Sequence, residues 1–280
     1  MSRILITGGS SYLGQHLVPL AATAHTVHYT YHQNQPNLTA TGSQLDIRDE
    51  TAVSTLITTF QPDIIIHLAG SNRGSDMAAV IRLGAGNVVW AAREVGARLI
   101  HLSTDSIFAG DAAPYDETAV PTPVNAYGRA KADAEAIVQQ HANSVIVRTS
   151  LIYGLAQMDH GTRWMADALA QGQLVTLFSN QIRNPVWVNS LCHALLELAH
   201  HRYTGILNVA GRQVLSRAEF ALRLLDYWQL QPRDTLTIAP SDGRWPLNCE
   251  LDLQRATAVL QTPLPGVDEV LAMNGRIHSA

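Results

Sequence analysis

The stretch RILITGGSSYLG, residues 3–14, decides the fold of this chain. Residues 3–7 have the apolar pattern of a short strand, a glycine-containing turn follows, and an apolar helical pattern begins after Gly14. A strand, a glycine turn and a helix in this order hold a phosphate at the helix N-terminus, where free backbone N–H groups and the helix dipole attract anions. The stretch predicts a dinucleotide-binding turn, with a plain tight turn as the alternative.

Predicted strands and helices alternate along the first half of the chain. The strands are residues 25–31, 45–47, 63–68, 97–102 and 144–149, and the helices are residues 49–60, 76–95 and a segment beginning near Tyr127. Alternation at this spacing is typical of right-handed βαβ units. We therefore predict an α/β fold with a doubly wound parallel sheet, a Rossmann fold. Pro19 is expected to leave the first helix short or kinked.

The pattern becomes less regular after residue 152. It predicts helices at residues 160–172, 190–201 and 216–229, strands at 174–178, 186–188 and 205–209, and a proline-punctuated loop at 232–249. We expect residues 1–152 to form a dinucleotide-binding domain whose core continues in part after 152. Residues 153–280 are expected to form mainly a small C-terminal α/β substrate lobe that closes over the sheet edge.

The composition is that of a globular protein of 280 residues, with 46% hydrophobic and 15% charged residues and a net charge of −4. There is no Lys/Arg cluster, so neither nucleic acid nor an anionic membrane is expected as a partner. Cys192 and Cys249 are expected to be buried thiols rather than a bridge, and the histidines show no metal-binding motif, so no metal is predicted. A strand at residue 3 leaves no room for a signal peptide, and no apolar run approaches the roughly 20 residues of a membrane span, so we expect a cytoplasmic protein.

The candidate catalytic residues lie in the segment STDSIFAGDAAPYDETAVPTPVNAYGRAK, residues 103–131. Tyr127 and Lys131 are four residues apart on a predicted helix and so share one face. A neighbouring ammonium favours the phenolate, which would suit Tyr127 to general acid or base catalysis. The alternative is an ordinary surface pair. Ser103 and Thr104 follow a predicted buried strand, where their hydroxyls would meet a substrate oxygen at the ligand-binding edge of the sheet.

The end of the second strand bears on the cofactor. An acidic residue there commonly binds the adenosine ribose 2′-OH, whereas basic groups suit a 2′-phosphate. This chain has no carboxylate at residues 31–35, which favours NADP or indifference between NADP and NAD, with His32 as the candidate contact. Asp46 and Ile47 are expected to meet the adenine ring, with a helix-capping aspartate as the alternative. The full set of cofactor candidates is Gly8, Ser10, Ser11, Tyr12, Leu13, Gly14, His32, Asp46, Ile47, Leu68, Ala69, Gly70, Ser103, Tyr127 and Lys131.

Together, the segments TGGSSYLG, HLAG, STDSIFAG, NAYGRAK and RTSLIYG resemble the extended short-chain dehydrogenase/reductases. The later segments QIRNPVWVNSL, GILNVAG and WPLNCELD are similar to the dTDP-4-dehydrorhamnose reductase branch. The resemblance covers nearly the whole chain. It implies NADP- or NAD-dependent reduction of the 4-keto group of dTDP-4-dehydro-6-deoxy-L-mannose. Tyr127 would be the proton donor, Lys131 would bind the nicotinamide ribose and lower the Tyr127 pKa, and Thr104 would hydrogen-bond the carbonyl.

The chain departs from the family pattern at three places. Ser11 replaces the middle glycine of the turn, where its Cβ would crowd the pyrophosphate. Ile81 and Arg82 stand where many members carry a proton-relay asparagine, and an Arg-Pro pair is split across residues 244–246. The substrate candidates by position are Asp105, Arg183, Trp187 and Asn248, and the last three have a surface arginine, a core tryptophan and a turn asparagine as alternatives.

Two other functions stay open. One is a related nucleotide-sugar epimerase, dehydratase or reductase, of which the first two recycle bound NAD without net cofactor consumption. The other is a non-catalytic NADP-binding regulatory subunit, favoured by Ser11 and the missing asparagine and opposed by the intact set of Thr104, Tyr127 and Lys131. A homodimer is also left open.

Overall fold

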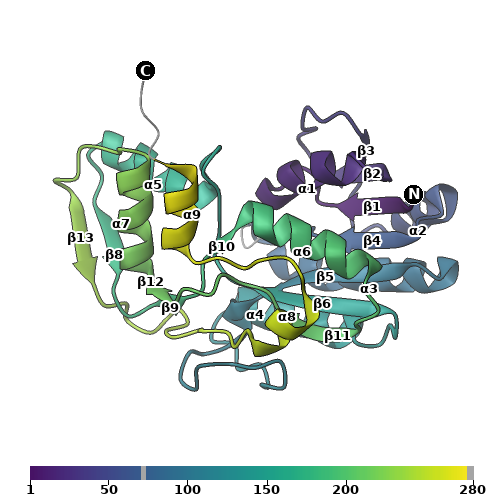
Figure 1. The fold of residues 1–280 in the computed structure, drawn as a ribbon. Coiled ribbons are helices and arrows are strands. Elements are labelled where there is room, and N and C mark those ends of the chain that lie inside the picture. Colours follow the sequence, from purple (N-terminus) through teal and green to yellow (C-terminus); the bar gives the residue numbers. More distant parts are fainter. Residues whose placement is uncertain (71–73, 276–280) are drawn as a thin grey trace.

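The computed structural model describes residues 1–70 and 74–275. They form two parts, seen side by side in Figure 1: a unit built on a large sheet, and a smaller lobe of short strands and helices. The large sheet has seven strands in the order β11-β6-β5-β4-β1-β2-β3, and every neighbouring pair is parallel. The strands are β1 (Arg3–Thr7), β2 (Thr26–Tyr31), β3 (Thr41–Gln44), β4 (Ile64–His67), β5 (Arg98–Thr104), β6 (Ser144–Thr149) and β11 (Gly205–Asn208). The predicted α/β class with a doubly wound parallel sheet is confirmed.

Helices cover both faces of this sheet, as the doubly wound class requires. One face packs against α1 (Tyr12–Ala22) and α6 (Val188–His200). The other packs against α2 (Glu50–Phe60), α3 (Met77–Val95) and α4 (Ala126–Val138). The central strands β4 and β6 are buried along their whole length, because they are covered on both faces, and this explains why their sequences, IIIH and SVIVRT, are mostly apolar or β-branched.

Two details of the first half differ from the sequence-based expectation. The third strand is Thr41–Gln44, and residues 45–47 follow it, so the strand was predicted a few residues too late. Leu45 and Ile47 are apolar because they pack into the core under α2 and α3, not because they pair in the sheet. Helix α1 does not end at Pro19 but runs to Ala22. Pro19 and Gln15, whose carbonyl loses its helical donor, are both exposed, so that carbonyl faces water.

The smaller lobe is built around a parallel pair, β8 (Val175–Phe178) and β13 (Leu236–Ala239). Helices α5 (His160–Ala170) and α7 (Arg217–Tyr227) pack beside it, and α9 (Val267–Asn274) packs against α7 in a separate hydrophobic cluster. The prediction of a loop throughout residues 232–249 was therefore wrong at β13, a four-residue strand, LTIA, whose two middle side chains are exposed and whose sequence does not alternate between apolar and polar residues. The remaining elements are short: η1 (Asp105–Ile107), β7 (Ile152–Tyr153), β9 (Ile182–Arg183), β10 (Val186–Trp187), β12 (Leu215–Ser216) and α8 (Gln254–Val259).

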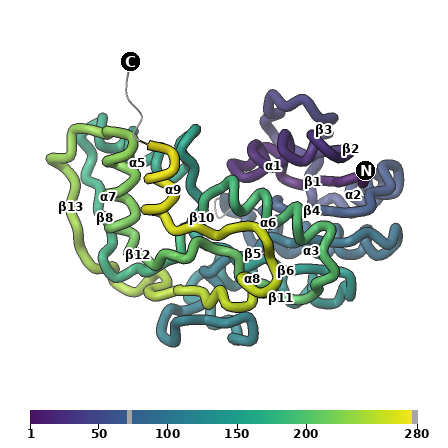
Figure 2. The backbone as a smooth tube through the Cα atoms, viewed as in Figure 1, coloured from purple at the N-terminus to yellow at the C-terminus, as the bar shows by residue number. Residues whose placement is uncertain are grey.

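The chain passes between the two parts several times, as the tube in Figure 2 shows. Helix α6 and strand β11 lie beyond residue 152 yet belong to the large sheet unit, and α8 packs beside β11. The segment after Pro240 returns from the lobe to lie against residues 108–115. Within the described residues, no helix is long and apolar enough to cross a membrane.

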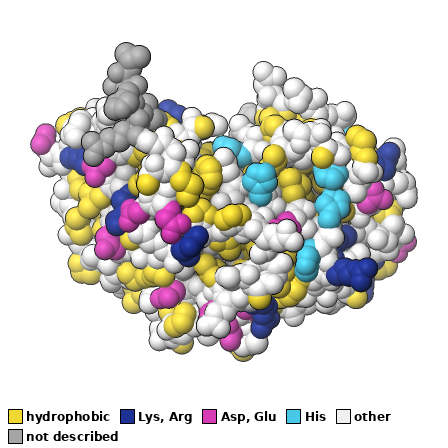
Figure 3. Space-filling view, in the orientation of Figure 1, with side chains coloured by type: hydrophobic (Ala, Val, Ile, Leu, Met, Phe, Trp, Pro, Cys, Tyr) yellow, Lys and Arg dark blue, Asp and Glu magenta, His cyan; other side chains and the backbone are white. Residues whose placement is uncertain are grey.

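Surface charges are distributed unevenly on the face shown in Figure 3. Histidine side chains gather over the sheet unit, whereas basic and acidic side chains lie close together on the lobe. Two pairs in the lobe are Arg223 with Asp268, at 2.6 Å, and Arg212 with Glu269, at 3.3 Å. These opposite charges are mixed rather than segregated by sign.

Candidate functional site

The turn after β1 is packed too tightly for side chains at two of its glycines. Gly8 has φ +75°, and a Cβ there would lie 2.8 Å from the amide nitrogen of Ala69, just after β4. A Cβ on Gly14 would lie 2.5 Å from the Gly8 carbonyl oxygen. Both positions therefore require glycine, and the turn brings the start of α1 against the end of β4. Ala69 and Gly70 are thereby placed beside the turn, as a dinucleotide site would need.

Ser11 has a defined task in this turn. It is the N-cap of α1, and its hydroxyl oxygen accepts a hydrogen bond from the Gly14 amide at 3.0 Å. Its backbone is extended, with φ −67°, so no glycine is needed there for conformational reasons. The departure from the family pattern thus stabilises the helix start at which a phosphate would bind.

Substitutions at Ser11 test its role as the N-cap of α1. Ser11→Ala is expected to lower the free energy of unfolding by about 1 kcal/mol because the cap is lost, and Ser11→Gly by only a few tenths. Urea unfolding followed by circular dichroism measures both. A Ser11→Ala variant as stable as the native chain would contradict the capping role.

The other residues of the turn contribute differently. Leu13 is buried in the core, so only its backbone is available to a ligand. The Tyr12 hydroxyl donates to the Gln157 carbonyl at 2.9 Å and so ties the turn to the loop before α5. Ser10 is half-buried, and its carbonyl accepts from the Gln15 side chain at 3.0 Å. The first amides of α1 have no intrahelical acceptor, and with the glycine packing this fits a dinucleotide pyrophosphate.

The carboxyl ends of β2 and β3 form a charged cluster. The His32 imidazole lies 3.8 Å from the Asp46 carboxylate, which also pairs with Arg48 at 2.6 Å. Arg48 reaches a second carboxylate, Asp76, at 2.5 Å. The Arg48 hydrogen bond lowers the pKa of Asp46 to about 2, so this carboxylate is ionised at neutral pH. Asp46 therefore supplies an acidic group close to His32, although the end of β2 itself has none.

Ile47 and Leu68 are turned away from any ligand. Both side chains are buried in the two cores of the large sheet unit. The Ile47 side chain fills the space above Gly84, and its carbonyl accepts from the Asn87 amide at 2.9 Å. At these two positions only the backbone can approach a cofactor.

Tyr127 and Thr104 come together at the carboxyl end of β5. Asn125 caps α4 by accepting from the Gly128 amide at 2.8 Å, which fixes the helix start that carries Tyr127. The tyrosine is half-buried and shares a hydrogen bond with the Thr104 hydroxyl. Burial raises the pKa of Tyr127 to about 12, a shift that the Thr104 hydrogen bond partly offsets. In this state the phenol is a proton donor at neutral pH.

Lys131 lies one turn further along α4 and points into the protein. It is the only lysine of the sequence, and its side chain is almost fully buried. Its ammonium donates to the Leu102 carbonyl at 2.6 Å and lies 3.4 Å from Nε2 of His101. Burial lowers the pKa of Lys131 to about 8, against a smaller opposite effect of Glu135. The group is thus close to its titration point at physiological pH.

Ser103 belongs to a buried polar network rather than to the exposed edge. Its hydroxyl donates to Glu135 at 2.5 Å, and Glu135 pairs with Arg148 of β6 at 2.8 Å. Arg148 also lies over the Phe108 ring, 5.2 Å from its centroid. Glu135 is one turn beyond Lys131, so the network clamps α4 to β5 and β6. Of the two adjacent hydroxyls, only that of Thr104 lies with Tyr127.

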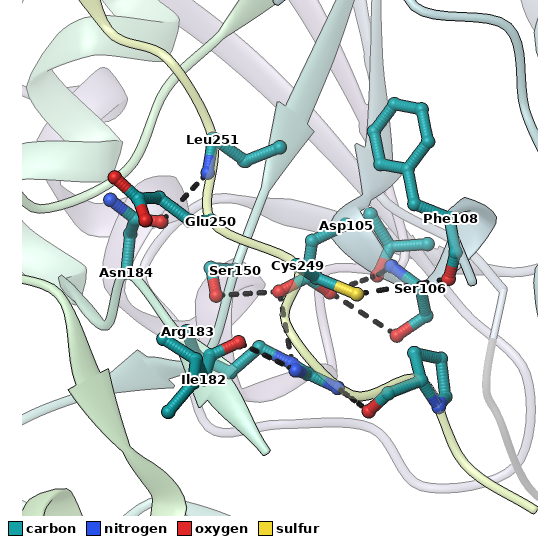
Figure 4. A network of polar contacts seen from close by, with 12 residues as sticks. Asp105, Ser106, Phe108, Ser150, Ile182, Arg183, Asn184, Cys249, Glu250 and Leu251 are labelled. Carbon is teal, nitrogen blue, oxygen red and sulfur yellow. Dashed lines mark hydrogen bonds and ion pairs between the residues drawn. The ribbon is translucent and has the colours of Figure 1, made fainter. Parts of the chain in front are cut away.

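Asp105 and Arg183 face each other in a buried ion pair (Figure 4), with 3.4 Å between Oδ2 and Nε. The carboxylate also accepts from the Ser150 hydroxyl at 2.6 Å and from Thr104 at 3.3 Å. Arg183 donates to the carbonyls of Ile182, Pro246 and Leu247. The structure thus brings these two substrate candidates together, and they join the carboxyl end of β5 to the lobe, with Asp105 also bonded to Thr104.

The other two substrate candidates lie at the boundary between the parts. Trp187 is half-buried and packs against the hydrophobic clusters of both the sheet unit and the lobe. The Asn248 side-chain oxygen accepts from the Glu250 backbone amide at 3.0 Å, and the Asn248 backbone amide donates to the Gly110 carbonyl. Both positions match their structural alternatives, a packed tryptophan and a turn asparagine, at the edge of the region where a substrate would lie.

Sequence reasoning missed Arg48, Glu135, and the histidines His67 and His101. Arg48 is two residues after Asp46, and Glu135 continues the four-residue spacing of Tyr127 and Lys131 on α4. His101 is two residues before Ser103 and so shares its face of β5. The sequence shows the spacing of each of these residues from a predicted site residue. It does not show which residue from another element each of them contacts in the folded protein.

Comparison with known proteins gives the family. The model of the RmlD substrate binding domain family matches residues 1–273. The beta subunit of methionine adenosyltransferase 2 from Mus musculus is 27% identical, covering 90% of this chain and 81% of its own. A dTDP-4-keto-6-deoxy-D-glucose reductase from Streptomyces niveus is 31% identical, covering 86% of each.

A solved structure is similar to this chain over nearly its whole length. A dTDP-4-dehydrorhamnose reductase from Bacillus anthracis in complex with NADP superposes with a TM-score of 0.78 at 26% identity, covering 97% of this chain and 96% of the other. Together with the dinucleotide turn and the Thr104, Tyr127 and Lys131 arrangement, the match over nearly all residues shows that the chain belongs to the RmlD substrate binding domain family of extended short-chain dehydrogenase/reductases.

Proposed function

We propose that this chain reduces the 4-keto group of dTDP-4-dehydro-6-deoxy-L-mannose, using NADPH or NADH. The observation that carries the proposal is the hydrogen bond between Thr104 and Tyr127, with Lys131 one helical turn away, beside a dinucleotide turn. Reductases of dTDP-linked sugars among the relatives support the substrate class.

The residues have distinct tasks in this reaction. Bound nicotinamide in its reduced form supplies a hydride to the carbonyl carbon. Tyr127 donates its proton to the carbonyl oxygen, so that a ketone, a hydride and a proton give an alcohol. Thr104 hydrogen-bonds the same oxygen and holds it near the phenol. The Lys131 ammonium stabilises the phenolate that is left, and solvent reprotonates it.

We assign the two parts of the chain to the two ligands. Residues 1–152, with α6, β11 and α8 packed on the same sheet, bind the dinucleotide, and most of residues 153–280 bind the nucleotide sugar. The loop linked to Tyr12 and the segment held by Arg183 lie on the lobe side of this boundary. They join the two proposed binding regions by hydrogen bonds.

The cluster at Asp46 leads to a prediction on cofactor choice. His32 and Arg48 are suited to a 2′-phosphate, whereas the ionised Asp46 repels it and suits a 2′-OH. We expect the native chain to use both NADPH and NADH, and Asp46→Asn to raise the ratio of kcat/KM for NADPH over NADH about 5-fold, a change of about 1 kcal/mol. Asp133→Asn, on the exposed side of α4, is the matched control. A ratio unchanged by Asp46→Asn contradicts this placement.

The test of the function is oxidation of NADPH, followed by absorbance, with dTDP-4-dehydro-6-deoxy-L-mannose as substrate. Stoichiometric oxidation with formation of the alcohol is expected. An epimerase or dehydratase would instead convert a nucleotide sugar without net loss of the added cofactor. Cofactor binding without turnover of this or other keto-sugars would overturn the proposal.

A second candidate is a dinucleotide-binding subunit of another enzyme. It is favoured by the relatives named as a beta subunit of methionine adenosyltransferase 2, which match 90% of this chain. Such a subunit would alter the activity of a partner enzyme, and this effect would persist in a Tyr127→Phe variant. The reductase is preferred because Thr104, Tyr127 and Lys131 are all present and adjacent.

A further inference from the structure

A row of buried polar side chains extends inward from Lys131, across three neighbouring strands. His101 on β5 lies 3.4 Å from the Lys131 ammonium, and the His67 ring on β4 has its centroid 5.1 Å from that of His101. His67 is hydrogen-bonded in turn to the Thr7 hydroxyl of β1 at 2.6 Å. Both histidines are 1% exposed. Burying two imidazoles in a hydrophobic sheet interior costs folding free energy unless their ring nitrogens are hydrogen-bonded.

These hydrogen bonds leave part of each imidazole unused. Within the described parts of the chain, Nε2 of His67 and Nδ1 of His101 are buried without a hydrogen-bond partner. Nε2 of His101, in contrast, faces Lys131. The most favourable use of His101 is therefore to accept from the ammonium through Nε2, with its own hydrogen on Nδ1.

The two histidines are uncharged. Burial and the nearby Lys131 charge lower the pKa of His67 to about 3 and hold that of His101 well below its usual value. A neutral His101 can accept a hydrogen bond from the ammonium through Nε2. Glu135 on α4 also acts on the Lys131 ammonium and is paired with Arg148, and Tyr127 lies one helical turn before Lys131.

We propose that His101 is a positioning residue, which acts with the Leu102 carbonyl to hold the Lys131 ammonium beneath Tyr127. An ammonium has three N–H donors. Two are directed inward by His101 and Leu102, which leaves the third for the side of α4 where Tyr127 lies. The importance of this contact for catalysis rests on the proposed reductase function, but the contact itself does not.

The composition of the chain supports this assignment. The sequence has 18 arginines and this single lysine. An arginine at position 131 could not adjust its charge near neutral pH, because a guanidinium stays protonated in proteins. An amine held by one carbonyl and one imidazole can do so.

The single lysine also makes a direct test feasible. In a chain labelled with ¹³C-lysine, the side-chain resonances belong to Lys131 alone, and their pH titration gives its pKa. In His101→Phe, which keeps a flat ring but removes the acceptor, we expect this pKa to fall by about one unit, because a hydrogen bond to a charged group is lost. In His101→Gln, whose side-chain oxygen can replace Nε2, it should return to near the native value. The alkaline limb of the kcat profile should move by the same amount.

Control variants distinguish loss of the His101–Lys131 contact from a general loss of stability. His141→Phe removes another buried histidine, one that bonds the Ala97 carbonyl, and should leave the titration unchanged. If His101→Phe does not fold, His101→Leu makes the same comparison, and thermal unfolding verifies each variant. A native-like titration in a folded His101→Phe or His101→Leu chain, or a fall in His101→Gln as large as in His101→Phe, overturns the proposal. The expected titration shift in a chain without turnover would retain the contact and overturn the reductase assignment.

Discussion

Tyr127→Phe is expected to lower kcat for keto-sugar reduction by roughly 100- to 10,000-fold, the usual contribution of a positioned acid. The phenol shares a hydrogen bond with Thr104 and lies one helical turn before Lys131, and its raised pKa of about 12 keeps the proton on oxygen until the transition state. Phenylalanine preserves the ring but has no proton to donate. Because the hydroxyl is lost and the packing is kept, binding of NADPH should change little.

Steady-state kinetics and fluorescence titration with NADPH measure these two quantities separately. Tyr203→Phe serves as the matched control, since this tyrosine bonds the Ile206 carbonyl near the start of β11, far from the carboxyl edge of the sheet. The control should retain native turnover. A Tyr127→Phe enzyme with turnover within several-fold of the native chain would show that another group donates the proton.

The second large effect is expected from the buried pair that clamps α4. Arg148→Met leaves the Glu135 carboxylate buried and unpaired, and we expect the free energy of unfolding to fall by 3–5 kcal/mol, an order-of-magnitude range for breaking such a pair. The side chains are 1% and 2% exposed, so solvent cannot replace the lost partner. Chemical unfolding at equilibrium gives the value.

Two further variants test whether the unpaired buried carboxylate is what lowers the stability of Arg148→Met. Arg148→Met combined with Glu135→Met replaces both charges by apolar groups, and it should be more stable than Arg148→Met alone because no uncompensated charge is buried. Arg82→Ala breaks an exposed pair with Asp133 between α3 and α4 and should cost about 0–1 kcal/mol. If Arg148→Met costs no more than Arg82→Ala, the network does not clamp the helix.

The elements that sequence predicted well are those whose pattern depends only on burial. Strands β4 and β6 are mostly apolar or β-branched because both faces are covered, and the spacing of Tyr127 and Lys131 puts them on one face of α4 whatever surrounds it. Strand β3 was displaced because an edge strand of mixed polarity, TGSQ, gives no such pattern. Its position depends on pairing with β2, which local sequence does not encode.

The sequence indicated the types of residue in the candidate site, but not which of these residues pair with one another. Asp105 and Arg183 are both predicted substrate contacts, yet they pair with each other although they lie 78 positions apart in the chain. The Lys131 ammonium contacts His101, 30 residues earlier, and no local pattern specifies that contact. Such choices are made by packing of whole elements, which decides whether a polar side chain faces a ligand or another residue.

The single buried lysine also determines how this protein responds to reagents that acylate amines. Apart from an amino terminus, such a reagent finds one target, Lys131, whose side chain is 5% exposed and donates to the Leu102 carbonyl of β5. The reagent can reach it only when α4 separates from the sheet. The rate of acylation at this one position therefore reports how often α4 opens, and a bound cofactor that holds α4 in place would slow it.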